Sequence, residues 1–142
     1  MISKFAPITK LKKEKLESLR RSLMQVNHKI HQIEEEISTT KNELLSYDKP
    51  SHGPALLFSQ YAMMTETFKK RINMAKEKLY YAMQEKNVVQ TQVNGALIEF
   101  EKFKYLQTQE EEAHRLKMKK EEALLLDEVA LMSYNLQQGS KR

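Results

Sequence analysis

Histidine and glutamate are the residue types in this chain whose spacing could support metal binding. His28 and His31 stand three residues apart, so they share a face if they lie on a helix, and Glu34 and Glu35 follow closely. The sequence contains no cysteine, and no further carboxylate completes a distinctive ligand set around the two imidazoles. The pattern favours surface histidines, and we expect no metal ion.

Two runs of glutamate raise the question of acid–base catalysis by paired carboxylates. They are Glu34–Glu35–Glu36 and Glu110–Glu111–Glu112. A catalytic carboxylate needs a cleft that excludes water and shifts its pKa, and a solvated two-helix rod, which the rest of the sequence predicts, has none. A cysteine nucleophile and a glycine-rich phosphate loop are also absent from the sequence. We therefore expect no catalytic residues, no cofactor and no enzyme activity.

Composition points to a helical protein of one domain. The 142 residues are 30% charged, 40% hydrophobic and only 8% aromatic, and the commonest types are strong helix formers. No stretch has the roughly 18 uncharged apolar residues of a membrane span, and the N-terminus lacks the apolar core of a signal peptide. We expect a cytoplasmic protein without direct membrane insertion. The net charge of +5 is compatible with several acidic partners.

The elements that position these residues follow from the spacing of apolar side chains, which recur in alternating steps of three and four. Such a period is typical of a left-handed coiled coil and excludes strands. The first series is Leu16, Leu19, Leu23, Val26, Ile30, Ile33, Ile37, Thr40, Leu44 and Tyr47. The second is Phe58, Tyr61, Thr65, Phe68, Ile72, Ala75, Leu79, Ala82, Lys86, Val89, Val93, Ala96, Phe100 and Phe103.

The two series are separated by the stretch SYDKPSHGPA, which holds Pro50, Gly53 and Pro54. Prolines lack an amide donor and disfavour helix in the residue before them, so this stretch ends one helix and begins another. A short connection makes the helices antiparallel neighbours. We predict an all-α hairpin in a single coiled-coil domain, 1–142: one helix over about 8–47, a turn at 48–54, a second helix over about 55–136, and a flexible end at 137–142.

A turn centred between His52 and Gly53 predicts a register in which facing residues have numbers that sum to 105. Ile30 then faces Ala75, Tyr47 faces Phe58, and Thr40 faces Thr65, which places the two seam threonines in one layer. The same register brings Phe5 opposite Phe100, so the first helix has no residues left to cover the second helix beyond that point.

The second helix is predicted to project unpaired from about Lys104. Its heptad seam turns polar there, and the sequence then becomes apolar nearly all round the helix from Ala123 to Tyr134. Exposed apolar surface of this kind marks an interaction site. The alternatives are coverage by residues Met1 to Leu11 or self-association.

Apolar residues also lie off the seam near the turn. They are Leu45, Leu56, Leu57, Met63 and Met64. A two-helix structure buries one stripe on each helix, so these side chains either face a partner, for which methionine is well suited, or broaden the core around the turn.

Over essentially its whole length the chain resembles the FliJ family of flagellar type III export proteins, and more distantly the stalk proteins of virulence type III secretion. The resemblance lies in the basic opening FAPITKLKKEKLESLRR, the break near residue 50, the segment YAMMTETFKKRI, and the charged run FEKFKYLQTQEEEAHRLKMKKEEALLLDEVALMSY.

The resemblance implies a non-enzymatic coiled coil similar to the central stalk of rotary ATPases, which binds the hexameric export ATPase, connects it to the membrane-embedded export gate and engages export chaperones. It implies a place at the inner face of the inner membrane. The open end, with Leu125, Val129, Met132 and Tyr134, would enter the ATPase ring. The turn-proximal residues Tyr47, Tyr61, Met64 and Phe68 would contact the gate, although Phe68 also lies on the predicted seam.

Three other functions fit a helical hairpin. A holdase chaperone would need an oligomerisation platform, of which the sequence shows no sign. A basic nucleic-acid-binding hairpin would lose affinity steeply with salt, and we expect no nucleic-acid partner. A structural coiled-coil adaptor is the remaining alternative.

Overall fold

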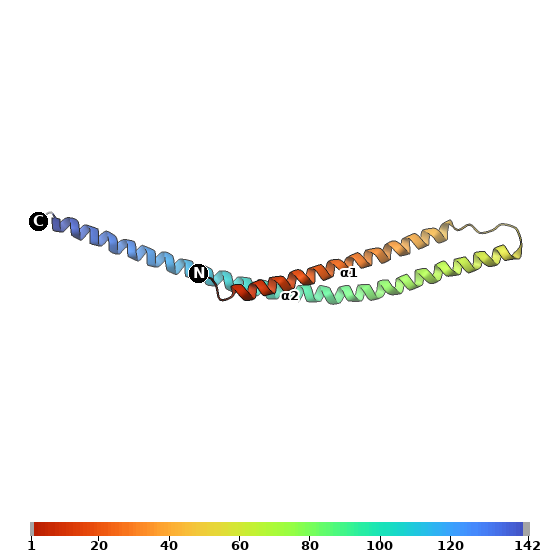
Figure 1. Ribbon diagram of the computed structural model, residues 1–142, viewed down its shortest axis with the longest axis horizontal. Coiled ribbons are helices and arrows are strands. Elements are labelled where there is room, and N and C mark those ends of the chain that lie inside the picture. Colours follow the sequence, from red (N-terminus) through yellow and green to blue (C-terminus); the bar gives the residue numbers. More distant parts are fainter. Residues whose placement is uncertain (1, 141–142) are drawn as a thin grey trace. The chain divides into compact units, whose positions relative to one another are not determined.

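The computed structural model describes residues 2–140, and these form two long helices, α1 (Ala6–Ser46) and α2 (Ala55–Ser140), with no strand among them. The helices pack against each other as a helical hairpin coiled coil, which confirms the predicted fold class (Figure 1). The sequence placed the end of the second helix near residue 136 and a flexible end at 137–142. α2 instead continues through Ser140, and Lys141 and Arg142 lie outside the described residues.

The helices divide between two compact units, which we describe in turn. The hairpin unit is Lys15–Ala96, and the terminal unit comprises Met1–Glu14 and Leu97–Arg142, of which residues 2–14 and 97–140 are described.

In the hairpin unit, the turn forms because its residues cannot continue a helix. α1 ends at Ser46, where the amide of Tyr47 donates to the carbonyl of Leu44 across 3.3 Å and tightens the last turn. Gly53 adopts φ of 130°, a conformation that side chains with a Cβ rarely adopt, and a Cβ there would approach Leu57 Cδ1 to 2.8 Å. α2 then begins, with the amide of Leu57 bonded to the carbonyl of Pro54 at 3.0 Å.

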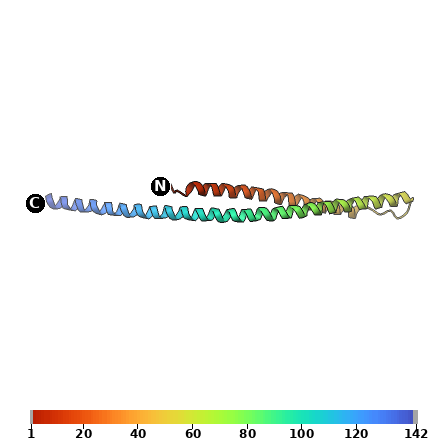
Figure 2. The ribbon, with the colours of Figure 1, turned by 90° about the horizontal axis from the view of Figure 1, so that it is seen from below.

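The core of the hairpin unit follows the predicted seam. Its buried cluster, flanked by Leu44, Leu79 and Val89, is Val26, Ile30, Ile33, Ile37, Ile72, Ala75 and Ala82. Both views show the α1 part of this unit running beside the yellow and green part of α2 (Figures 1 and 2). Large side chains of α1 therefore pack against alanines of α2, as close helix packing requires.

The predicted register is wrong by about one heptad. Lys29 Nζ lies 3.5 Å from Glu85 Oε2, and Arg71 Nη1 lies 3.7 Å from Glu43 Oε2, so residues near one another across the seam have numbers that sum to well above 105. A heptad pattern matches itself every seven residues, so only the turn could fix the register. The turn is not symmetric about His52 and Gly53, because the first residues of α2 extend past the end of α1 at Ser46.

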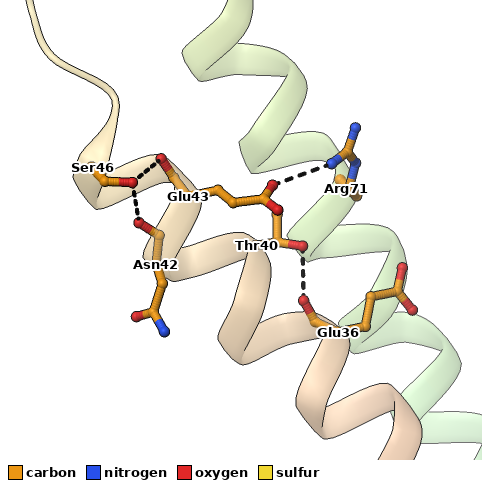
Figure 3. Close-up of polar contacts among 6 residues, drawn as sticks. All are labelled: Glu36, Thr40, Asn42, Glu43, Ser46 and Arg71. Carbon is orange, nitrogen blue, oxygen red and sulfur yellow. Dashed lines mark hydrogen bonds and ion pairs between the residues drawn. The ribbon is translucent and has the colours of Figure 1, made fainter.

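The two seam threonines therefore do not face one another, and each hydroxyl is satisfied within its own helix. Thr40, which is buried, donates to the carbonyl of Glu36 at 2.8 Å, and Thr65 donates to the carbonyl of Tyr61 at 2.8 Å. Figure 3 shows the Thr40 bond beside the ion pair between Glu43 and Arg71.

In the terminal unit, the start of α1 is capped by a buried serine. Ser3 is 2% exposed; its hydroxyl accepts the amide of Phe5 at 3.1 Å and its carbonyl accepts the amide of Ala6 at 3.1 Å. A side-chain acceptor for an otherwise unpaired amide is the usual device at a helix start.

The segment 2–14 packs along α2 further than the sequence predicted. Lys12 Nζ lies 3.7 Å from Glu99 Oε2 and 5.7 Å from the ring centroid of Phe103, and the amide of Lys4 donates to Glu110 Oε1 at 3.2 Å. The expectation that α2 is unpaired from Lys104 is therefore wrong, because the described residues before Ala6 extend the paired region to Glu110.

Candidate functional site

The start of α2 has no helical neighbour within the hairpin unit. Because Glu43 pairs with Arg71 in an antiparallel arrangement, Ser46 at the end of α1 lies level with α2 near Phe68. Residues 55–60 are all exposed. The exposed apolar side chains that follow from this offset are Leu56, Leu57, Phe58, Met63 and Met64.

An aromatic cluster closes the core at this end, and we call it the turn cluster: Tyr47, Tyr61 and Phe68. The rings of Tyr47 and Tyr61 stack with centroids 5.5 Å apart and planes 10° apart, and Phe68 meets Tyr47 edge-on at 6.0 Å. Sequence reasoning missed this stacking, because the predicted register paired Tyr47 with Phe58, which is 38% exposed.

The four turn-proximal residues named from the sequence differ in accessibility. Met64 is 41% exposed, Tyr47 and Tyr61 are half-buried, and Phe68 is 8% exposed. Phe68 therefore belongs to the core, where it supports Tyr47 and lies 5.7 Å from the guanidinium of Arg71. Tyr61 and Met64 offer the accessible surface.

At the other end of α2, in the terminal unit, every described side chain from Arg115 to Gly139 is exposed. The four residues named from the sequence, Leu125, Val129, Met132 and Tyr134, are 60%, 51%, 64% and 58% exposed. The segment 2–14 does not cover them, since its contacts reach only to the region of Glu110. We call this apolar stretch, residues 123–136, the terminal surface.

The histidine and glutamate motifs of the sequence form pairs within a single helix. His31 Nε2 lies 3.0 Å from Glu35 Oε1, one helical turn away. Glu112 accepts two hydrogen bonds from Arg115, at 2.6 Å and 3.1 Å, and this bonding lowers the pKa of the Glu112 carboxyl. Within residues 2–140, no three histidine or carboxylate side chains converge as metal ligands would.

Neither helix, over its described length, contains a stretch long and apolar enough to cross a bilayer.

Comparison with known protein families assigns this chain to one of them. The family model described as the flagellar FliJ protein matches residues 1–139, which is nearly the whole chain. This chain belongs to the FliJ family. It is accordingly a component of the flagellar type III export apparatus, and the FliJ family is a non-catalytic part of that machinery. No curated protein and no solved structure gives a significant match.

Proposed function

We propose that this FliJ-family chain is a central-stalk-like coupling element of the flagellar export apparatus. It binds the export ATPase hexamer through the terminal surface, contacts the export gate through the turn-proximal residues, and engages export chaperones without catalysing a reaction itself. It acts in the cytoplasm, at the inner face of the inner membrane.

The exposure of the terminal surface carries this proposal. Eight large apolar side chains on one uninterrupted helix are more than half exposed, namely Leu124, Leu125, Leu126, Val129, Leu131, Met132, Tyr134 and Leu136. They lie nearly all round the helix, so a flat partner would leave some of them in water. The lumen of a ring surrounds a helix and matches this distribution, and apolar burial there gains roughly 25 cal/mol for each Å² removed from water.

The test replaces Leu125 and Val129 together by Asp in the full chain. Both side chains are exposed in the free protein, so the thermal unfolding midpoint of the hairpin should be unchanged, whereas stimulation of the purified export ATPase should be lost. The matched control is Leu11→Asp with Met24→Asp, two side chains that are 64% and 71% exposed outside the terminal surface. Full stimulation by the Leu125 and Val129 variant would refute ring insertion.

For the gate, the turn cluster supports a division of roles. Tyr61 and Met64 are accessible enough to contact a partner, whereas Phe68 is buried against Tyr47 and positions it. Met64→Ala should therefore weaken binding to the gate protein with a small change in thermal stability. Tyr61→Ala should also weaken it, and should in addition lose the stacking on Tyr47, which is worth about 0.5–1.5 kcal/mol. Phe68→Ala should lower stability by about 3–5 kcal/mol as a core truncation.

The gate assignment fails if Tyr61→Ala and Met64→Ala both retain full affinity for the purified gate domain in a titration.

A further inference from the structure

One face of α2 at its exposed start carries side chains in a regular order. Pairs of adjacent residues recur at seven-residue intervals, first Leu56 and Leu57, then Met63 and Met64, then Lys70 and Arg71. In a coiled coil, residues seven apart lie on the same side of the helix. All six are exposed, the four apolar ones by 65%, 42%, 69% and 41% in chain order. We call these six residues the outer face.

The outer face contains no acidic residue. Gln60, Thr67 and Met74 lie at the intervening heptad position and are also exposed, and the next acid at an equivalent position is Glu77. Glu66 is not one of the six, but it lies one helical turn before Lys70 on a neighbouring row of the helix surface. This part of the hairpin unit therefore has an apolar end followed by a cationic band.

The cations of this band remain accessible. No ion pair involves Lys70 within the described residues, and the pair between Arg71 and Glu43 is long at 3.7 Å with both side chains half exposed. The hydroxyl of Thr67, which lies between the second apolar pair and the cationic pair, already donates to the carbonyl of Met63 at 2.9 Å. The leucine and methionine side chains of the two apolar pairs therefore offer a partner flexible apolar surface and no hydrogen-bond donors.

We propose that the outer face docks the start of α2 on the surface of an anionic lipid bilayer. Leucine and methionine side chains enter the boundary between headgroups and acyl chains, and Lys70 and Arg71 meet the lipid phosphates. Peripheral attachment of a helix needs both an apolar and an electrostatic contribution, and the outer face supplies the two in sequence.

A bilayer fits this face better than a protein does. Protein interfaces are enriched in aromatic anchors and contain fixed hydrogen bonds, whereas the six residues of the outer face include no aromatic side chain. The docking concerns side chains only, since neither helix could span a membrane. The outer face shares Met64 with the proposed gate contacts, so its apolar contribution is tested at Leu56 and Met63, which are not among them.

The chain contains no tryptophan, so a single introduced tryptophan reports on its own position. In Met63→Trp, emission should move to shorter wavelength when vesicles of phosphatidylglycerol and phosphatidylcholine are added, and should not move with phosphatidylcholine alone. Met24→Trp, at a 71% exposed site of α1, should not respond to either. A shift in Met132→Trp with none in Met63→Trp would overturn the proposal by assigning lipid contact to the terminal surface.

A flotation assay with the same vesicles tests the two contributions separately. Leu56→Gln with Met63→Gln should weaken binding about tenfold or more, since two large apolar side chains are no longer buried. Lys70→Glu should weaken it and flatten its salt dependence. Leu11→Gln with Met24→Gln is the matched control and should bind normally, and circular dichroism checks folding. No vesicle binding, equal binding to neutral vesicles, or an unaffected Leu56 and Met63 variant would each refute lipid docking.

Discussion

The register of the hairpin core can be tested at Ala82, which is 1% exposed and lines the same groove between the helices as Ile33. Ala82→Leu adds a branched side chain where α1 leaves space for a methyl group. Overpacking of this kind destabilises a core by about 1–3 kcal/mol. The expected result for the single variant is therefore a free energy of unfolding lower by that amount.

The informative variant combines this change with a truncation on α1. Ile33→Ala alone should destabilise by about 2–5 kcal/mol, because Ile33 is 7% exposed and leaves a cavity. In the double variant the new leucine occupies that cavity. The two effects should then fall short of additivity by about 0.5–3 kcal/mol, the range for residues in contact.

The control is Leu23→Ala, since Leu23 is the residue that faces Ala82 in the register predicted from the sequence. Urea unfolding followed by circular dichroism gives the free energies of all five variants. The observed register is supported if the changes in unfolding free energy of Ala82→Leu and Ile33→Ala are not additive in the double variant, while those of Ala82→Leu and Leu23→Ala are additive. The reverse pattern would refute it and restore the pairing that sums to 105.

Three further results are expected. Thr40→Val should change the free energy of unfolding in urea by less than about 1 kcal/mol. The buried Thr40 hydroxyl bonds only within its own helix, and a methyl group of similar shape replaces it. A larger loss would show that the hydroxyl has another role. The pKa of the Glu112 carboxyl, followed by NMR, should lie below the usual range of a glutamate because of the hydrogen bonds from Arg115. Since this pKa is depressed in the folded state, its contribution to helix stability is present at neutral pH and is lost as pH falls through the lowered pKa. Arg115→Gln should raise the pKa, and no change would exclude Arg115 as the cause. Every methionine in the described part of the chain is at least 41% exposed, so peroxide should oxidise these side chains, as mass spectrometry would detect, while the thermal midpoint stays constant; a lower midpoint would place a methionine in the core.

The fold could be predicted because the heptad spacing of the apolar residues runs through both helices and stops at Pro50 and Pro54. The buried positions Ile30, Ile33 and Ala82 all belong to the predicted seam. The register could not be predicted, because a seven-residue repeat fits equally well after a shift of seven and the turn was assumed to be symmetric.

The two candidate surfaces were predictable to different degrees. Leu125 and Val129 are exposed as expected, since the sequence near them offers no complementary stripe. The role of Phe68 could not be decided from the sequence, because a seam position near a turn is buried or exposed according to the register. The extension of the paired region to Glu110 was missed because it depends on the backbone amide of Lys4, which has no sequence signature.

Partner binding by the stretch of α2 beyond Arg115 depends on its helix–coil equilibrium, because no other helix packs against this stretch within the terminal unit. Most of the stability of a protein helix comes from tertiary packing, which this stretch lacks. The observed affinity of the segment is therefore its intrinsic affinity scaled by the fraction of molecules that are helical there. Residues of this stretch outside the terminal surface, such as Lys119 and Lys120, therefore influence binding through helix propensity. Substitutions outside the contact surface can therefore change the affinity of this end of α2 for its partner.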